Sequence, residues 1–205
     1  LIPVLSIDGD RRSTDDRRGV GLYSRVISAA EVLKRSKMFY GLSITITRHN
    51  FDQVTDPGYL ERYHKLGCRL FFFVEYVPQS SQDRDCCLTE DQKSVLRSRT
   101  EKLREELPGL YVCMPGEEEK FGGCLAAGRG FVHVSPQGDL EACPFAPYSD
   151  SNIINMPLTE ALDSMLLSRI RDSHHLLKES EGGCALWENR EWVEELMESP
   201  GSMSA

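Results

Sequence analysis

The sequence lacks the run of about 20 apolar residues that a membrane-spanning helix requires. It also lacks a surplus of positive charge, because 24 Lys and Arg residues face 32 Asp and Glu residues, which gives a net charge of −8. A protein that binds mainly to a phosphate backbone requires clustered cations, so this balance argues against a nucleic-acid partner. We therefore expect neither a membrane nor a nucleic acid as a partner.

A methionine is missing from the first position, and no charged leader precedes the first apolar run, Leu1–Ile7. A secretory signal peptide would begin with such a charged region. We interpret the chain as a fragment whose N-terminal part is missing, and we expect a cytoplasmic protein.

Low hydrophobicity combined with high charge, which would indicate disorder, is absent too. The chain has 205 residues with 40% hydrophobic and 27% charged composition, enough for one large domain or two small ones. The charge is divided unevenly, with a net +2 over 1–112 and −10 over 113–205. This shift predicts two domains, 1–112 and 113–205.

The first part predicts an alternation of strands and helices. Short β-branched or aromatic runs indicate buried strands, and apolar residues at helical spacing indicate amphipathic helices. We expect strands over 2–7, 42–47 and 70–77, helices over 22–36, 57–66 and 89–107, and a charged loop over 10–21. Three strand–helix repeats favour a parallel sheet, in which ligands bind at the carboxyl ends of the strands.

Polar residues gather where these strands end. They are Ser6, Asp8 and Gly9 after the first strand, Thr47, Arg48, His49 and Asn50 after the second, and Glu75, Val77 and Pro78 after the third. A ligand-binding rim requires such residues, but Asp-Gly and Asn are also ordinary turn formers. Both interpretations stay open on the pattern alone.

The second part contains a predicted β-hairpin between two cysteines. Strands at 131–134 and 140–142 flank a turn in which Gly138 takes a positive φ. Cys124 precedes the first strand and Cys143 follows the second, so the hairpin would bring the two sulfurs near one another. Cys184 follows a Gly-Gly pair, as Cys124 does. We expect helices over 159–172 and 188–197.

Four interpretations compete for the seven cysteines. Buried free thiols are common. An odd count and the lack of a visible secretory signal argue against disulfides. Zinc favours closely spaced CxxC pairs, and none occurs in the sequence. Widely spaced single cysteines from separate loops suit an iron–sulfur cluster better.

The first part of the sequence resembles the radical S-adenosylmethionine (radical SAM) enzymes. The residues that carry the resemblance are Ser6–Gly9 at a strand end, Asp15–Gly19 before the helix, and Ile44–Asn50 on the next strand. The resemblance implies an α/β fold, in which 1–112 is the C-terminal half of a partial (β/α)6 TIM-like parallel barrel.

The second part resembles the SPASM/Twitch extension that follows such a barrel, a small α+β domain with a β-hairpin. Cys124, Gly138 and Cys143 fit its opening pattern of a Cys, 9–15 residues, a Gly, four residues and a Cys. Only Cys184 follows, which is similar to the shorter Twitch form. The resemblance implies one auxiliary [4Fe–4S] cluster with Cys124, Cys143 and Cys184 as ligands.

Two motifs of the family are missing from the chain: CxxxCxxC, which binds the cluster that cleaves the cofactor, and Gly-Gly-Glu. The family places both near the N-terminus of the barrel, so the resemblance implies that the missing part binds a second [4Fe–4S] cluster. The fragment alone is then expected to be inactive.

The resemblance further implies an oxidoreductase that cleaves S-adenosylmethionine to a 5′-deoxyadenosyl radical, which takes a hydrogen atom from the substrate. Its cofactor contacts would be Ser6, Thr47, Asn50 and Val77. A peptide or protein substrate and a reductant such as flavodoxin or ferredoxin are the implied partners. The alternative is a non-catalytic iron–sulfur or zinc-binding interaction module.

Overall fold

The computed structural model describes residues 2–78, 81–114, 122–177 and 184–198. The chain forms two compact units, Leu1–Gly116 and Glu117–Ala205. Among the described residues, no helix has both the length and the apolar character needed to cross a lipid bilayer. Gly182 and Gly183, which precede Cys184, lie outside the described residues.

The first unit is built on a four-stranded sheet in the order β1 (Val4–Ile7), β2 (Gly41–Ile46), β3 (Leu70–Glu75) and β4 (Leu110–Met114). Every neighbouring pair is parallel. The predicted parallel sheet is thereby confirmed, and β1 lies at one of its edges. The strand β4 was not predicted, and it crosses the domain boundary expected at residue 112.

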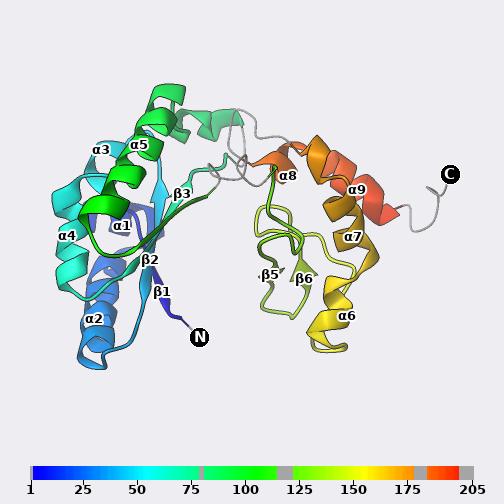
Figure 1. The fold of residues 1–205 in the computed structure, drawn as a ribbon, viewed down its shortest axis with the longest axis horizontal. Coiled ribbons are helices and arrows are strands. Elements are labelled where there is room, and N and C mark those ends of the chain that lie inside the picture. Colours follow the sequence, from blue (N-terminus) through cyan, green and yellow to red (C-terminus); the bar gives the residue numbers. More distant parts are fainter. Residues whose placement is uncertain (1, 79–80, 115–121, 178–183, 199–205) are drawn as a thin grey trace. The chain divides into compact units, whose positions relative to one another are not determined.

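Helices cover one face of this sheet (Figure 1). They are α1 (Arg11–Arg18), α2 (Leu22–Arg35), α3 (Phe51–Val54), α4 (Pro57–Lys65) and α5 (Glu90–Glu106). The 3-10 helix η1 (Ser81–Cys86) lies between β3 and α5 in the sequence. The buried row Ile7, Ile44, Phe73 and Cys113 runs in register across all four strands within the core. These apolar strands are buried because a helical layer packs on them.

Local signals fix the ends of the helices. Asp56 caps α4 by accepting a hydrogen bond from the backbone N–H of Tyr59 (2.9 Å), and Pro57 occupies its first turn. Gly67, with φ +96°, follows its end. Thr89 and Gln92 form the predicted capping box of α5.

The prediction of a loop over 10–21 is wrong, because α1 occupies most of that segment. This helix has no apolar period that would reveal it, and Thr14 is its one buried residue. Its ends are instead stabilised by polar groups. Asp10 accepts from the N–H of Ser13 (2.9 Å), and Arg17 and Arg18 lie in the last turn, where cations favour the helix dipole.

The second unit contains the predicted antiparallel hairpin, β5 (His133–Val134) and β6 (Leu140–Glu141). Gly138 has φ +87°, as the turn requires. The remaining elements are α6 (Leu158–Leu162), α7 (Met165–Asp172), η3 (His174–Leu176), α8 (Ala185–Glu188) and α9 (Arg190–Glu198).

The prediction of a single helix over 159–172 is wrong, since α6 and α7 are separate helices. Ser164 is the reason, because its side chain caps α7 by accepting from the N–H of Leu167. The last helix was expected to begin at residue 188. It begins at Arg190, after the short helix α8.

Candidate functional site

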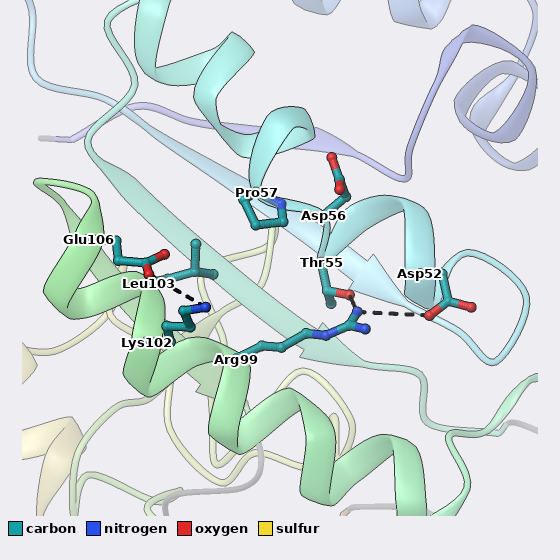
Figure 2. Close-up of a pocket in the computed structure, with 8 residues that line it drawn as sticks. All are labelled: Asp52, Thr55, Asp56, Pro57, Arg99, Lys102, Leu103 and Glu106. Carbon is teal, nitrogen blue, oxygen red and sulfur yellow. Dashed lines mark hydrogen bonds and ion pairs between the residues drawn. The ribbon is translucent and has the colours of Figure 1, made fainter.

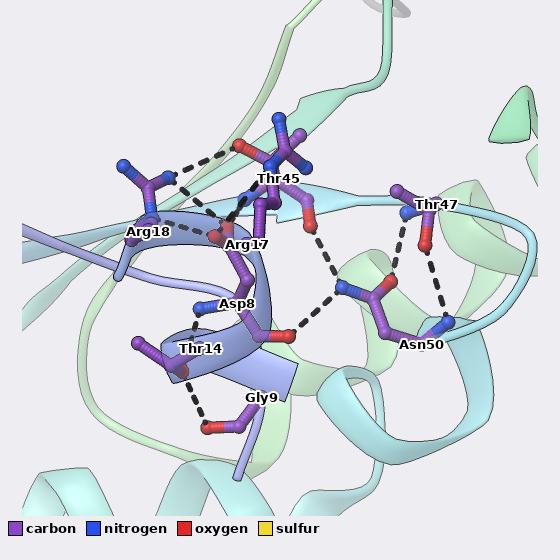
Figure 3. A network of polar contacts seen from close by, with 8 residues as sticks. All are labelled: Asp8, Gly9, Thr14, Arg17, Arg18, Thr45, Thr47 and Asn50. Carbon is purple, nitrogen blue, oxygen red and sulfur yellow. Dashed lines mark hydrogen bonds and ion pairs between the residues drawn. The ribbon is translucent and has the colours of Figure 1, made fainter. Parts of the chain in front are cut away.

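The carboxyl end of β1 carries a buried carboxylate with two arginines (Figure 3). Asp8 is 1% exposed and lies directly after β1. Arg18 forms a bidentate pair with it, from Nε to Oδ2 (2.5 Å) and from Nη2 to Oδ1 (3.0 Å). Arg17 lies 3.7 Å from the same carboxylate. The bidentate pair compensates the cost of burying Asp8 and leaves one positive charge in excess.

This carboxylate joins three segments of the chain. The backbone N–H of Thr45, on β2, donates to Asp8 Oδ1 (3.3 Å), and the N–H of Asp8 donates to Thr14 Oγ1 on α1 (3.2 Å). Arg17 extends the network toward β3, because its guanidinium lies 5.4 Å from the ring centre of Tyr76. The ends of β1 and β2 are thus tied to each other through α1.

Thr47 and Asn50, two of the predicted cofactor contacts, lie together after β2. The N–H of Thr47 donates to Asn50 Oδ1 (2.7 Å), and the N–H of Asn50 donates to Thr47 Oγ1 (3.3 Å). Asn50 Nδ2 donates to the carbonyls of Asp8 (3.0 Å) and Thr45 (2.9 Å). One amide proton of Asn50 therefore joins this loop to the residue after β1, and the other bonds to β2.

The other two predicted contacts lie at the ends of β1 and β3, the strands on either side of β2. Ser6 is half-buried on β1, in register with Ser43 of β2. Val77 is buried just after β3, at 5% exposure. A cofactor role for Ser6, Thr47, Asn50 and Val77 stays a prediction.

Sequence reasoning did not identify the roles of Arg17, Arg18 and Thr45 at this edge. A signal for the arginines was present: an Asp that ends a buried strand must find a cation, and both arginines follow within ten residues. Thr45 contributes through its backbone N–H, which the sequence does not reveal.

A separate cavity of about 270 Å³ lies among the helices of the first unit, lined by α3, α4 and α5 (Figure 2). Arg99 donates to Thr55 Oγ1 and lies 3.8 Å from Asp52, and Lys102 lies 3.6 Å from Glu106. Both cations of this cavity are thus paired with acidic side chains. None of the predicted site residues lines it.

The second unit gathers the three predicted ligands, Cys124, Cys143 and Cys184, each of them buried. A hydrogen bond between the thiols of Cys143 and Cys184 raises the pKa of Cys143 well above its usual range, and burial raises it further. Cys124 is near enough to act on Cys143 electrostatically. The sulfurs of three distant segments therefore share one neighbourhood.

Backbone donors point at two of these sulfurs. The N–H of Trp187 donates to Cys184 Sγ (3.4 Å), and the N–H of Phe145 donates to Cys143. Such bonds stabilise a thiolate, the form that binds iron. Within the described parts of the chain, no three His, Cys, Asp or Glu side chains are placed around a point where a single metal ion would bind.

A hydrogen-bonded pair of side chains crosses the hairpin close to Cys143 in the sequence. Glu141, two residues before Cys143, is 8% exposed, and its Oε2 lies 2.6 Å from Nδ1 of His133 across the hairpin. The pair provides Glu141 with the partner that a buried carboxylate needs.

Comparison with known proteins gave one curated relative and several solved structures; no protein-family model matches the chain. The AdoMet-dependent heme synthase of Methanosarcina barkeri is 25% identical over 211 residues, which cover 90% of this chain and 58% of that protein.

Among solved structures, Streptococcus suis SuiB matches 97% of this chain with a TM-score of 0.61 at 17% identity. SuiB bound to S-adenosylmethionine gives the same TM-score, and SuiB bound to its precursor peptide SuiA gives 0.57 at 18% identity. The chain spans about half the length of these proteins. The comparisons confirm the resemblance to radical SAM enzymes, while the solved structures bear on the fold alone.

Proposed function

We propose that this chain, which resembles a radical SAM enzyme over most of its length, is the C-terminal portion of such an oxidoreductase and carries an auxiliary [4Fe–4S] cluster. The gathering of Cys124, Cys143 and Cys184 in the second unit is the observation that supports this most directly. It coincides with similarity to SuiB along 97% of the chain.

The donor set fits a cluster better than a single zinc ion. A structural zinc ion takes four ligands around one point, and the described residues include no three-ligand group of that kind. The three cysteines come singly from separate segments of the chain, a pattern that suits an iron–sulfur cluster. The N–H groups of Trp187 and Phe145 would stabilise the thiolate charge.

When bound, S-adenosylmethionine and a reduced cluster supply a radical that abstracts a hydrogen atom from the substrate. The chain's own contribution is to bind and orient. Ser6, Thr47 and Val77 lie at successive strand ends, where a parallel sheet presents its ligand site. The Asp8–Arg18 pair and Asn50 hold these ends in a fixed arrangement.

A peptide or protein is the substrate that we propose first, because SuiB, whose fold the chain shares, was solved with its precursor peptide. A heme precursor is the second candidate, favoured by the sequence similarity to the heme synthase of M. barkeri. We further propose a cytoplasmic protein with flavodoxin or ferredoxin as the reductant.

The test uses the protein expressed from its complete gene and reconstituted anaerobically with iron and sulfide. With S-adenosylmethionine and dithionite, we expect 5′-deoxyadenosine to form. With the true substrate present, we expect a hydrogen atom of that substrate in the 5′-deoxyadenosine. The coding sequence before Leu1 should contain CxxxCxxC. A complete gene without that motif, or a reconstituted protein that forms no 5′-deoxyadenosine, would contradict the proposal and favour a non-catalytic binding module.

Variants separate the auxiliary cluster from the radical chemistry. Cys143→Ala should lose substrate turnover and retain cleavage of S-adenosylmethionine, since the cleaving cluster would belong to another part of the protein. Cys68→Ala is the matched control, because Cys68 is also buried but lies in the first unit, where its thiol donates to the carbonyl of Leu70 (3.3 Å).

A further inference from the structure

A groove of about 650 Å³ lies between α2 and α4, in the helical layer of the first unit. Its lining residues are Tyr23, Ile27, Lys34, Gly58, Arg62, Lys65 and Leu66. Its volume falls in the range of small-molecule sites. None of the residues assigned to the proposed function lines it.

Three cations and no carboxylate line the groove. Lys34 on α2 donates from Nζ to the carbonyl of Lys65 at the end of α4 (2.8 Å), so its charge is held across the groove. Lys65 itself lies 3.5 Å from Glu61. Within the described part of the chain, Lys34 and Arg62 form no ion pair with an acidic side chain. The groove therefore carries uncompensated positive charge.

Arg62 is held in place by aromatic rings. Its guanidinium carbon lies 5.4 Å from the ring centres of both Tyr59 and Tyr63. Cation–π contacts of this kind restrain the side chain and leave its N–H groups available as donors. The cations of the cavity in Figure 2 differ, because each of them faces an acidic partner.

The rest of the lining is apolar or aromatic. Ile27 and Leu66 pack partly against the core, and Tyr23 adds an aromatic face. Gly58, on α4, has no side chain and keeps the space beside the groove open. A hydrophobic floor with a few fixed cations matches a ligand that has an apolar body and an anionic head.

We propose that this groove binds a small amphipathic organic anion, with its apolar body on Tyr23, Ile27 and Leu66 and its acidic group on Lys34 and Arg62. The ligand class is an aromatic or alicyclic carboxylate, sulfonate or phosphate. The site is separate from the strand ends at which we place the cofactor, so its occupancy can be tested independently.

The probe is 1-anilinonaphthalene-8-sulfonate, whose fluorescence rises on binding, and its neutral counterpart is N-phenyl-1-naphthylamine, which lacks the sulfonate. Arg62→Gln should weaken binding of the sulfonate about tenfold, as loss of a charge-assisted hydrogen bond would, and should leave the neutral probe unchanged. Arg97→Gln, an exposed cation on α5, is the control and should change neither.

A second variant tests the space rather than the charge. Gly58→Leu fills the groove, and the added Cβ meets only Asp56 Oδ1, at 3.1 Å. It should weaken both probes, whereas Gly58→Ala should weaken neither. The proposal is overturned if Arg62→Gln leaves sulfonate binding unchanged, if it weakens both probes equally, or if Gly58→Leu has no effect on either probe.

Discussion

Replacement of Asp8 by Asn should destabilise the first unit by about 3 kcal/mol, because breaking a buried ion pair leaves a charge without its partner. The Asp8 side chain is 2% exposed and that of Arg18 is 25% exposed, so Arg18 would recover only part of its solvation in the variant. The amide oxygen can still accept at the Oδ1 position from Thr45 N–H and from Arg18 Nη2. The change therefore removes the negative charge and the bond from Arg18 Nε to Oδ2.

The matched control lies on α1, the helix that carries Arg18. Arg12 and Asp16 form an exposed pair at 3.6 Å, with side chains 89% and 72% exposed. Asp16→Asn makes the same carboxylate-to-amide change there and should cost less than about 1 kcal/mol, as surface pairs do.

Native-state hydrogen exchange of β2 amides at increasing urea concentration measures the stability of the first unit. Fluorescence of Trp187 and Trp192, both in the second unit, reports separately on that unit and should not change. If Asp8→Asn costs no more than Asp16→Asn, the Asp8–Arg18 pair does not hold the strand ends, and the reasoning is refuted. If the pair does hold the strand ends, adding Arg18→Gln to Asp8→Asn should restore part of the stability that Asp8→Asn alone removes.

Three further predictions follow from the first unit. Thr89→Ala should destabilise α5 by about 1 kcal/mol, since Thr89 Oγ1 accepts from the N–H of Gln92 (3.1 Å); urea unfolding with unchanged stability would contradict the cap. Burial raises the pKa of Cys68 to about 11 from 9.0, so the unfolded thiol ionises first and stability should fall between pH 9 and 11. This fall should be about 2 to 3 kcal/mol smaller in Cys68→Ala, and equal pH profiles for the two proteins would contradict the shift. Amides of the edge strand β1 should exchange faster than those of β2 and β3; slower exchange in β1 would show that the edge is covered.

The sheet was largely predictable because its strands are continuous apolar runs and its helices carry clear end signals. The capping box of Thr89 and Gln92 indicates the start of α5, and Gly67 indicates the end of α4. In contrast, β4 was missed because its apolar residues coincide with the change in charge that suggested a domain boundary. The polar sequence of α1 has no hydrophobic period, so its stability comes from capping and ion pairs that only the folded chain reveals.

The candidate site was predictable in part. The hairpin around Gly138 predicted that Cys124 and Cys143 would lie near one another, and Cys124 does act electrostatically on Cys143. No local pattern could pair the thiol of Cys143 with that of Cys184, forty-one residues further along the chain. Asn50 illustrates the limit of assigning a ligand role from position alone. Its amide protons are engaged by the carbonyls of Asp8 and Thr45, which is a structural task that the sequence does not display.

The most direct test of the central claim is the iron content and Mössbauer spectrum of this chain after anaerobic reconstitution with ⁵⁷Fe and sulfide. We predict about four irons per chain in a cubane environment, and their loss when Cys124, Cys143 and Cys184 are all replaced by Ala. Iron that is retained in the triple variant, or a wild-type chain that takes up no iron, would contradict the account.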